Sequence, residues 1–439
     1  MRIALIGAGQ RGSIYAAYLR EKGIEISAVV EPVASRRNRA VEDYDIPQAF
    51  SCLEDFLAQG RIADAAVVAT MDRDHFRCAM PLLKAGYHLL LEKPISPDSE
   101  ECLRIQEAAD ARGLLVMVCH VLRYTEFFTR IKDIIDSGEL GRIQTIEYAE
   151  YMGNFHMAHS FVRGKWNRTD TSSPIILQKS CHDMDILTWL VGCRAAKVSS
   201  FGNLSYFRPE NAPEGSALRC KDCTLGERCR FNAYRTYLPM IGKWRAVDVT
   251  DDTTEEGMRR ALDEGPYGRC VFHCDNNVCD QQTTAIQFEN GVTAAFQMSA
   301  FSDHMHRRIK IMCEHGSLRG DDAENHLTIT RFGSFADVPT PPEEIALHPY
   351  RGRHGGGDIG LVDAFVQALA KKISQRSRVA GTPNGEIPSG TSEISRSIES
   401  HLIANAAEES RLTGETVYMN SYKEGLHEFL QRELLKTIS

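Results

Sequence analysis

The chain has 439 residues, of which 43% are hydrophobic and 25% are charged, and its formal net charge is −8. A chain of this length is expected to form two or three domains, and its composition is typical of a globular protein rather than a disordered or fibrous one. The negative charge argues against nucleic acid as a partner, because binding to a phosphate backbone depends on cationic side chains.

The cysteine content and the N-terminus indicate the cellular compartment. The 13 cysteines cannot all form disulfides because their number is odd, so we expect reduced thiols. The apolar residues 3–6 follow Met1-Arg2 at once, which leaves no room for an export signal before structure begins. The longest apolar stretch, residues 114–122, is much shorter than the roughly 20 residues of a membrane span. We therefore expect a cytoplasmic protein without a membrane segment.

The first 122 residues alternate between strand and helix patterns. Strands are expected at residues 3–6, 24–30, 65–70, 89–91 and 115–119, and helices at residues 13–23, 75–84 and 96–112, the last beginning at Ser96-Pro97. Strands that alternate with helices of this length indicate right-handed βαβ units and a parallel sheet. Residues 1–122 are therefore predicted to be a doubly wound, Rossmann-type domain.

A glycine motif lies between the first expected strand and the first expected helix. Gly7, Gly9 and Gly12 follow the G-x-G-x-x-G spacing, in which the glycines allow a tight turn, a close approach of pyrophosphate, and close packing of helix on sheet. The helix N-terminus, with Gln10 and Arg11, would face the phosphates. The other interpretation is a structural glycine turn in a domain that binds no nucleotide.

The end of the second expected strand bears on which dinucleotide is bound. Glu31 would accept hydrogen bonds from ribose hydroxyls and repel a 2′-phosphate, which favours NAD. Arg36 and Arg37 follow closely and could pair with such a phosphate, so NADP stays open. A solvated loop is the ordinary role of such an arginine pair.

Residues 123–439 show a different pattern. Helices are expected at residues 124–137, 183–191, 361–371 and 394–412, and strands at residues 143–151, 285–288, 292–298, 309–313 and 327–331. Because no helices separate the later strands, they indicate a large open and mostly antiparallel sheet. We predict a second α/β domain over residues 123–439, with a cysteine-rich insertion at about residues 205–280 and a linker-like stretch at residues 381–390.

Three motifs in order give a specific resemblance. The glycine motif, the tripeptide Glu92-Lys93-Pro94 and the segment Lys179-Ser180-Cys181-His182-Asp183-Met184-Asp185 together resemble the glucose–fructose oxidoreductase / inositol dehydrogenase / MocA family. The resemblance extends from residue 1 to the Gly355-Gly356-Gly357-Asp358 segment and the helix after it. It implies a Rossmann domain followed by an α/β domain with an open sheet, which often carries an oligomer interface. A homo-oligomer, either a dimer or a tetramer, is therefore expected.

The resemblance also implies catalytic roles. Lys93 matches a lysine that holds or polarises the substrate hydroxyl, His182 matches the catalytic histidine, and Asp185 matches an acid one helical turn further on. Many members carry an aspartate where this chain has Gln178. Either Lys179 replaces it, with a pKa lowered by burial and by Lys93, or the proton path uses His182 alone. Without the resemblance, Lys93 would ordinarily be interpreted as an exposed loop lysine and His182 as a capping or core histidine.

The resemblance, together with positions in the chain, implies further site residues. Cofactor contacts are expected from Thr70, Asp74, His75 and Glu92, together with Lys93. Substrate contacts are expected from Arg123, Tyr124, His159, Arg163, Trp166 and Asp183, with His354 and Asp358 as weaker candidates at the rim of the cleft. Residues 157–167 could equally be interpreted as an ordinary surface loop rather than a substrate loop.

Six of the cysteines fall within the insertion. They are Cys220, Cys223, Cys229, Cys270, Cys274 and Cys279. The C-x2-C pair with further thiols suggests structural zinc, and less favourably an iron–sulfur cluster. The alternative is a set of reduced thiols that pack the insertion without binding metal.

The sequence therefore predicts an NAD(P)-dependent oxidoreductase acting on a secondary hydroxyl of a sugar, a glycoside or an inositol. One alternative is a glycosidase or lyase that oxidises C3 of the sugar transiently and recycles bound NAD. An alternative of another class is a non-catalytic dinucleotide-binding sensor, although such a protein has no need of a base beside the nicotinamide.

Overall fold

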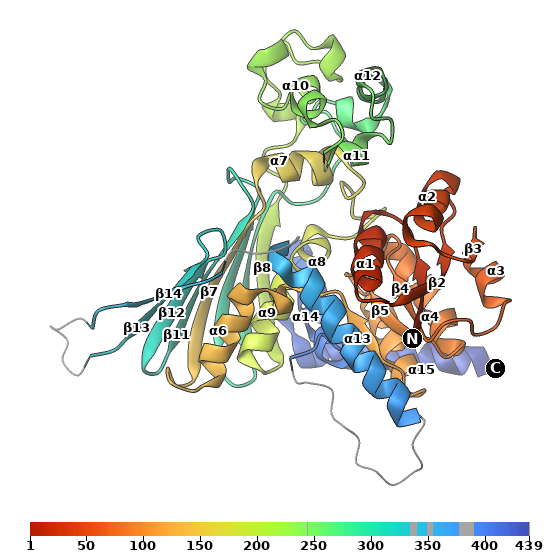
Figure 1. The fold of residues 1–439 in the computed structure, drawn as a ribbon. Coiled ribbons are helices and arrows are strands. Elements are labelled where there is room, and N and C mark those ends of the chain that lie inside the picture. Colours follow the sequence, from red (N-terminus) through yellow and green to blue (C-terminus); the bar gives the residue numbers. More distant parts are fainter. Residues whose placement is uncertain (244, 334–339, 349–353, 377–389, 439) are drawn as a thin grey trace.

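The computed structural model describes residues 1–243, 245–333, 340–348, 354–376 and 390–438. Two β-sheets organise them, one of six strands and one of nine (Figure 1). All but the last residue of the predicted linker at 381–390 lie outside the described residues. Within the described part of the chain, no helix has the length and apolar character that crossing a membrane requires.

The first sheet is parallel and has the strand order β3-β2-β1-β4-β5-β6. This is the order of a dinucleotide-binding Rossmann fold, in which ligands bind beyond the carboxyl ends of the strands. Its strands are β1 (Arg2–Ile6), β2 (Glu25–Val30), β3 (Ala49–Phe50), β4 (Ala65–Val68), β5 (His88–Leu91) and β6 (Val116–Val118). The connecting helices are α1 (Gln10–Glu21), α2 (Ala34–Tyr44), α3 (Leu53–Leu57), α4 (His75–Lys84) and α5 (Ser99–Asp110).

Both faces of this sheet are buried, because successive residues of a strand point to opposite sides. Ile3 and Leu5 pack with α1 on one face, whereas Ala4 and Ile6 belong to the core that includes α4 and α5. Helix α13 (Gly357–Arg376) follows the second sheet in the chain but packs on the first of these faces. The Rossmann layer is therefore completed by a helix from far along the chain.

The second sheet is mixed and mostly antiparallel. Its order is β14-β13-β12-β11-β7-β10-β9-β8-β15, and only the β7–β10 pair is parallel. The strands are β7 (Ile143–Tyr151), β8 (Ala195–Asn203), β9 (Gln281–Phe288), β10 (Thr293–Ser299), β11 (His306–Cys313), β12 (Gly316–Asp321), β13 (His326–Arg331), β14 (Glu343–Ala346) and β15 (Val417–Tyr418). The predicted fold class, a Rossmann sheet followed by a large, mostly antiparallel open sheet, is confirmed.

One face of the second sheet carries helices and the other is open (Figure 1). The covering helices include α6 (Glu126–Asp136), α9 (Cys181–Val191) and α14 (Ile394–Thr413), with α8 (Ile175–Gln178) and α15 (Met419–Ile438) nearby. Burial alternates along β9 and β10, so every second side chain of these strands is exposed. The core between this sheet and its helices is continuous with one face of the Rossmann sheet.

The insertion forms a separate lobe beyond one end of the second sheet (Figure 1). It consists of short helices around a small apolar core, among them η5 (Cys220–Asp222), η6 (Gly226–Arg228), α10 (Ala233–Tyr237), α11 (Ala246–Val249), α12 (Glu255–Glu264) and η8 (Pro266–Gly268). Helix α7 (Asn154–His156) and the π-helical turn η3 (Met157–Arg163) connect β7 to this region.

Two helices of the first domain begin about three residues away from the expected position. The helix expected from Ser96-Pro97 begins at Ser99, because Ser96 forms a turn in which its hydroxyl accepts a hydrogen bond from the Asp98 amide and donates one to Glu101. The first helix begins at Gln10 rather than Ser13, directly after Gly9.

Candidate active site

The glycine loop after β1 has the shape that a dinucleotide requires. Gly7 has φ of +92°, and a Cβ there would lie 2.6 Å from the Ala69 carbonyl oxygen. A Cβ on Gly12 would lie 2.0 Å from the Gly7 carbonyl oxygen, whereas one on Gly9 would meet nothing within 4 Å. Helix α1 begins here with no side-chain cap, so its first N–H groups can receive a pyrophosphate. The loop therefore fits the cofactor that the sequence predicted.

Glu31 lies at the end of β2 beside this loop and is buried. Its carboxylate accepts hydrogen bonds from the Ala8 amide at 2.9 Å and the Val33 amide at 3.0 Å. Each oxygen retains a lone pair that could accept a ribose hydroxyl. Arg37 donates to the backbone carbonyls of Glu31 and Pro32, which holds its guanidinium against the loop.

Replacing Gly12 with alanine is expected to weaken NADH binding at least about tenfold, equivalent to 1.4 kcal/mol, and to lower the melting temperature. The added methyl would force α1 away from the turn at Gly7. Fluorescence titration and thermal denaturation would measure both effects. Gly425→Ala is the matched control because a Cβ there meets nothing within 4 Å. Unchanged NADH affinity in Gly12→Ala would contradict this account of the loop.

Glu92 and Arg11 belong to a set of ionic contacts that connects α1, the end of β5 and α13. Glu92 accepts hydrogen bonds from Arg11 Nε at 2.7 Å and the Tyr15 hydroxyl at 2.6 Å. Arg11 also pairs with Asp358 at 2.7 Å, and Asp358 lies 2.8 Å from His354 Nδ1. Burial acts to raise the pKa of Asp358, but His354 and Arg11 outweigh it and lower that pKa to about 2. Arg11, predicted as a cofactor contact, thus bridges β5 and α13 through two carboxylates.

The loop after β4 is fastened to the Glu92-Lys93-Pro94 tripeptide. His75 is buried, with Nδ1 at 2.6 Å from the Pro94 carbonyl oxygen and Nε2 at 3.3 Å from that of Thr70. Asp74 is more exposed and pairs with Arg77 at 2.9 Å. These residues lie beyond the carboxyl ends of β4 and β5, as the cofactor prediction requires.

Lys93, Lys179 and His182 bring three nitrogen bases to one region between the two sheets. The Lys93 ammonium donates to the Gln178 carbonyl oxygen at 2.7 Å, which attaches the Rossmann edge to the end of α8. The Lys179 ammonium lies 3.2 Å from Glu150. His182 Nδ1 has no hydrogen-bond partner among the described residues. The structure thus brings together Lys93, Lys179 and His182, three of the residues for which catalytic roles were expected.

The environment of His182 and Lys179 favours their neutral forms. Burial lowers the pKa of His182 well below its ordinary value, and the nearby charge of Lys93 lowers it further. Burial also lowers the pKa of Lys179, although Glu150 opposes the shift. A neutral imidazole can accept a proton from a hydroxyl group.

A buried ionic network beneath the bases was not anticipated from the sequence. Arg307 donates to Glu150 at 2.7 Å and to Asp183 at 2.6 Å, and Tyr148 donates to the same oxygen of Asp183. Ser180 donates to Glu150 at 2.9 Å. Burial acts to raise the pKa of Glu150, but Arg307 and Lys179 outweigh it and the pKa is lowered. Burial dominates at Asp183 and raises its pKa.

This network changes the interpretation of Asp183. The residue was expected to contact substrate, yet it is fully buried and its carboxylate faces Arg307 and Tyr148. The sequence offered one signal of the network, because Glu150 occupies a buried position of an alternating strand. The register between β7 and β11, in which Arg307 lies opposite Glu150, is visible only in the structure.

Asp185, Arg123 and Tyr124 stabilise the junction between the domains. Asp185 accepts two hydrogen bonds from Arg123, at 2.6 and 2.7 Å, and all of these groups are buried. The Tyr124 hydroxyl lies 3.1 Å from the Ser392 hydroxyl and accepts a bond from the Ser392 amide. The structure therefore places the carboxylate of Asp185 on Arg123, with no hydrogen bond between Asp185 and His182 among those described.

His159 and Arg163 hold the insertion against the core. His159 Nδ1 lies 2.9 Å from the Tyr237 hydroxyl, and its ring stacks on Tyr267. Arg163 donates to the carbonyl oxygens of Arg269 and Phe231, each at 2.7 Å. The predicted substrate donors of this segment are thus occupied by the insertion.

The same segment contributes two other side chains. The indole N–H of Trp166 is buried without a hydrogen-bond partner among the described residues. His156, which the sequence analysis did not single out, lies close enough to Lys179 for that charge to lower the pKa of His156, after burial as the largest cause. His156 also contacts Arg245 of the insertion.

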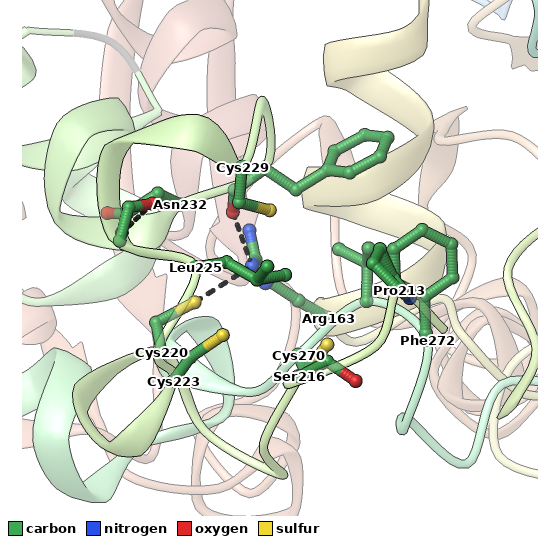
Figure 2. A pocket seen from close by; sticks show the side chains of 13 residues that line it. Arg163, Pro213, Ser216, Cys220, Cys223, Leu225, Cys229, Asn232, Cys270 and Phe272 are labelled. Carbon is green, nitrogen blue, oxygen red and sulfur yellow. Dashed lines mark hydrogen bonds between the residues drawn. The ribbon is translucent and has the colours of Figure 1, made fainter. Parts of the chain in front are cut away.

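The predicted zinc site is not supported. Across residues 1–243, 245–333, 340–348, 354–376 and 390–438, no three histidine, cysteine, aspartate or glutamate side chains meet as ligands of one ion. The six cysteines are all free and do not form one group, because Cys274 and Cys279 are absent from the pocket that the other four line (Figure 2). Four tetrahedral zinc ligands would need to lie about 3.8 Å apart, given Zn–S bonds of about 2.3 Å.

Comparison with known proteins supports the motif resemblance. Residues 1–120 match the oxidoreductase family with an NAD-binding Rossmann fold, and residues 128–319 match the GFO/IDH/MocA C-terminal domain. YteT of Bacillus subtilis (strain 168), named as an oxidoreductase, is 25% identical over 319 residues, covering 69% of this chain and 72% of YteT.

Two further proteins are similar to this chain, one in sequence and one in fold. An inositol 2-dehydrogenase of Corynebacterium glutamicum is 30% identical over 201 residues, which cover 45% of this chain and only 56% of that enzyme. Levoglucosan dehydrogenase, solved with NADH and L-sorbose, shares the fold with a TM-score of 0.68 over 95% of this chain and 97% of its own, at 16% identity. Because family models match residues 1–120 and 128–319, the chain belongs to the GFO/IDH/MocA family of NAD-binding oxidoreductases.

Proposed function

We propose that this protein is an NAD-dependent dehydrogenase that transfers a hydride between the nicotinamide and a secondary hydroxyl of a sugar, a glycoside or an inositol. The observation that carries the proposal is the meeting of Lys93, Lys179 and His182 beyond the carboxyl end of β5. A nicotinamide ring is expected at this edge of a Rossmann sheet. The named relatives act on an inositol and on an anhydrosugar, which agrees with a polyhydroxylated substrate.

Each base has a distinct part in this proposal. The charged Lys93 ammonium donates to the substrate hydroxyl oxygen and stabilises the negative charge that develops there. His182, held neutral by burial, accepts the hydroxyl proton at its imidazole ring. Lys179 replaces the family's carboxylate, and Glu150 fixes its position. The bound NAD supplies the hydride acceptor.

NAD is preferred to NADP in this proposal. Glu31 is buried with its carboxylate toward the loop that would hold the adenosine ribose, so a 2′-phosphate would meet a negative charge. Arg37 is held by backbone carbonyls. Titration with NADH and NADPH under the same conditions tests this preference, and tighter binding of NADPH would refute it.

Purified protein incubated with NAD and a panel of sugars, inositols and aryl glycosides tests the reaction. We expect NADH to accumulate with at least one substrate, followed by its absorbance. Release of aglycone without net NADH would instead support the glycosidase alternative, because such an enzyme reoxidises its own cofactor. The sensor alternative would be supported if the protein binds NADH but forms no NADH and releases no aglycone. It also requires that Lys93→Ala and His182→Ala keep full function in vivo.

We also propose a homo-oligomer formed through the open face of the second sheet. Thr293, Ala295 and Gln297 of β10 project from this face between β7 and β9. Replacing Ala295 with arginine places a charge at its centre and is expected to shift a dimer or tetramer to a smaller species in light scattering coupled to size exclusion. Ala58→Arg, which adds the same charge at the exposed end of α3 in the first domain, serves as the control. A monomeric wild-type protein would refute the proposal.

A further inference from the structure

Three buried histidines meet where the two domains join. The ring of His120 lies edge to face with those of His182 and His401, with its centroid 5.5 Å from each. His120 follows β6, His182 lies on α9 and His401 lies on α14, so the group draws on distant parts of the chain. Of the three, His182 alone has a part in the proposed hydride transfer.

His120 is the unusual member of this group. It is completely buried, and neither of its ring nitrogens has a hydrogen-bond partner among the described residues. It is also the only polar side chain in the buried apolar stretch of residues 114–122. A buried polar group without a partner destabilises a protein, and an apolar ring would avoid that cost. The imidazole at this position therefore needs an explanation beyond packing.

His401 does not supply that explanation. Its Nε2 accepts a hydrogen bond from the Ile95 amide at 2.9 Å, so its proton is on Nδ1, which lies 3.2 Å from the Ser397 carbonyl oxygen. Both nitrogens of His401 are thus occupied, and this residue is a packing neighbour of His120. The polar groups left to His120 are His182 and Asp185, whose Oδ1 lies 3.8 Å from His120 Nε2.

His182 lacks a contact that a base of its kind requires. Its Nδ1 is buried without a partner among the described residues, which leaves Nε2 to face the substrate hydroxyl. Nε2 can accept a proton only if the neutral ring carries its own proton on Nδ1. That buried N–H then needs an acceptor, a place that a carboxylate takes in the catalytic triad of serine proteases.

We propose that His120 is the positioning residue for His182, accepting a hydrogen bond from its Nδ1–H and directing its own Nε2–H toward Asp185. The proposal rests on the proposed function of His182. An N–H···N bond of about 2.9 Å between two imidazoles puts their centroids about 5 Å apart. The observed separation is 5.5 Å, so a small turn of the rings closes the contact.

This arrangement gives His182 the tautomer that proton transfer needs. On oxidation of the alcohol, the O–H bond breaks and its proton goes to His182 Nε2, while the hydride leaves the same carbon for the nicotinamide. The Nδ1 proton stays on His182, and the new positive charge is stabilised through His120 by Asp185. Asp185 Oδ1 accepts one hydrogen bond from Arg123 at 2.7 Å and retains a lone pair for a second donor.

Charged groups act on the two histidines from each neighbouring element. They are Glu92 and Lys93 after β5, Arg123 in η2 and Asp185 on α9, with Lys179 after α8 and Arg307 on β11 also acting on His182. Burial is the largest cause that lowers the pKa of His120, and Arg123 and Lys93 lower it further against the effect of Glu92. His120 is therefore neutral, so one of its nitrogens can accept.

NMR of NAD-loaded protein containing ¹⁵N-labelled histidine tests the proposal without any measurement of activity. The signals of His182 are assigned by their loss in His182→Gln. We expect His182 to carry its proton on Nδ1 in the wild type and to lose this preference in His120→Phe. A proton on Nε2 in the wild type would overturn the proposal, and so would an unchanged tautomer in His120→Phe.

Steady-state kinetics of the same variant gives a second test. His120→Phe is expected to lower kcat by about 10–100-fold and to change the substrate KM less, because orienting partners act on the chemical step. Losing an acceptor for Nδ1–H also lowers the pKa of His182, so the loss of kcat on acidification should move to lower pH. An unshifted profile would show that His120 only fills space, and a shift to higher pH would show that it carries a charge. Either result contradicts the proposal.

Two further variants separate positioning from stability. His120→Gln keeps an acceptor and a donor and should recover part of kcat and of the wild-type pH profile, whereas failure to exceed His120→Phe in both would count against the proposal. His88→Phe removes a buried imidazole at the start of β5 that accepts the Leu115 amide, so it should lower thermal stability without moving the pH profile. Absence of turnover by the wild type on every substrate would refute the proposed function, and the tautomer of His182 would still decide the role of His120.

Discussion

Lys93→Met is expected to lower kcat/KM by about 10²–10⁴-fold, the range typical of a positioned proton-transfer or charge-stabilising group. The methionine keeps the length of the side chain but removes the ammonium that would bind the substrate oxygen. NADH affinity should fall less than kcat/KM, because the glycine loop and Glu31, which would hold the dinucleotide, are left in place by the substitution. The measurements are steady-state kinetics with the substrate found in the panel and NADH titration of the same preparation.

The pH profile distinguishes this role from a purely structural one. The charge of Lys93 lowers the pKa of His182, after burial as the largest cause. Removing the charge should raise the pKa of His182, so the loss of kcat/KM on acidification should begin at a higher pH than in the wild type. Lys84→Met at the exposed end of α4 is the matched control and should change neither rate nor profile. An unshifted acid limb with reduced thermal stability would indicate that Lys93 acts only through its bond to Gln178.

The fold could be predicted because its signals are local and periodic. Alternation of strand and helix patterns indicates the parallel sheet, and the glycine spacing marks where the cofactor binds. The place of α13 could not be predicted in this way, because nothing in residues 357–376 shows that they pack on the first sheet. Its position follows from long-range contacts, including Arg11 to Asp358.

The site could be predicted only in part, for a related reason. Lys93 and His182 belong to short motifs, whereas Glu150 and Arg307 meet through the register between β7 and β11. His159 and the residues around it were expected to face substrate because their polar groups suit a sugar. The insertion uses these groups instead, and the sequence does not show which surface an inserted lobe covers.

Arg307→Met is expected to reduce the free energy of unfolding by about 3–5 kcal/mol, because it removes the cation between two buried carboxylates. The effect should depend on pH. Arg307 opposes the rise in pKa at Asp183 and lowers the pKa of Glu150, so both carboxyl pKa values should rise in the folded variant. A group whose folded pKa lies above its unfolded pKa binds protons on folding. The loss of unfolding free energy in Arg307→Met, relative to the wild type, should therefore become smaller as the pH falls from 8 to 5. Urea denaturation at several pH values measures this.

Arg308→Met provides the control on the same strand. Its side chain is 65% exposed and lies 3.8 Å from Asp321, so its removal should change stability by less than about 0.5 kcal/mol. Adding Glu150→Gln to Arg307→Met removes one of the two stranded charges and should recover part of the lost stability, whereas Glu150→Gln alone should destabilise. Additive effects of the two substitutions would show that Arg307 and Glu150 do not interact energetically. Recovery in the double variant would instead show that Arg307 and Glu150 are energetically coupled, as expected if the arginine keeps Glu150 ionised beneath Lys179.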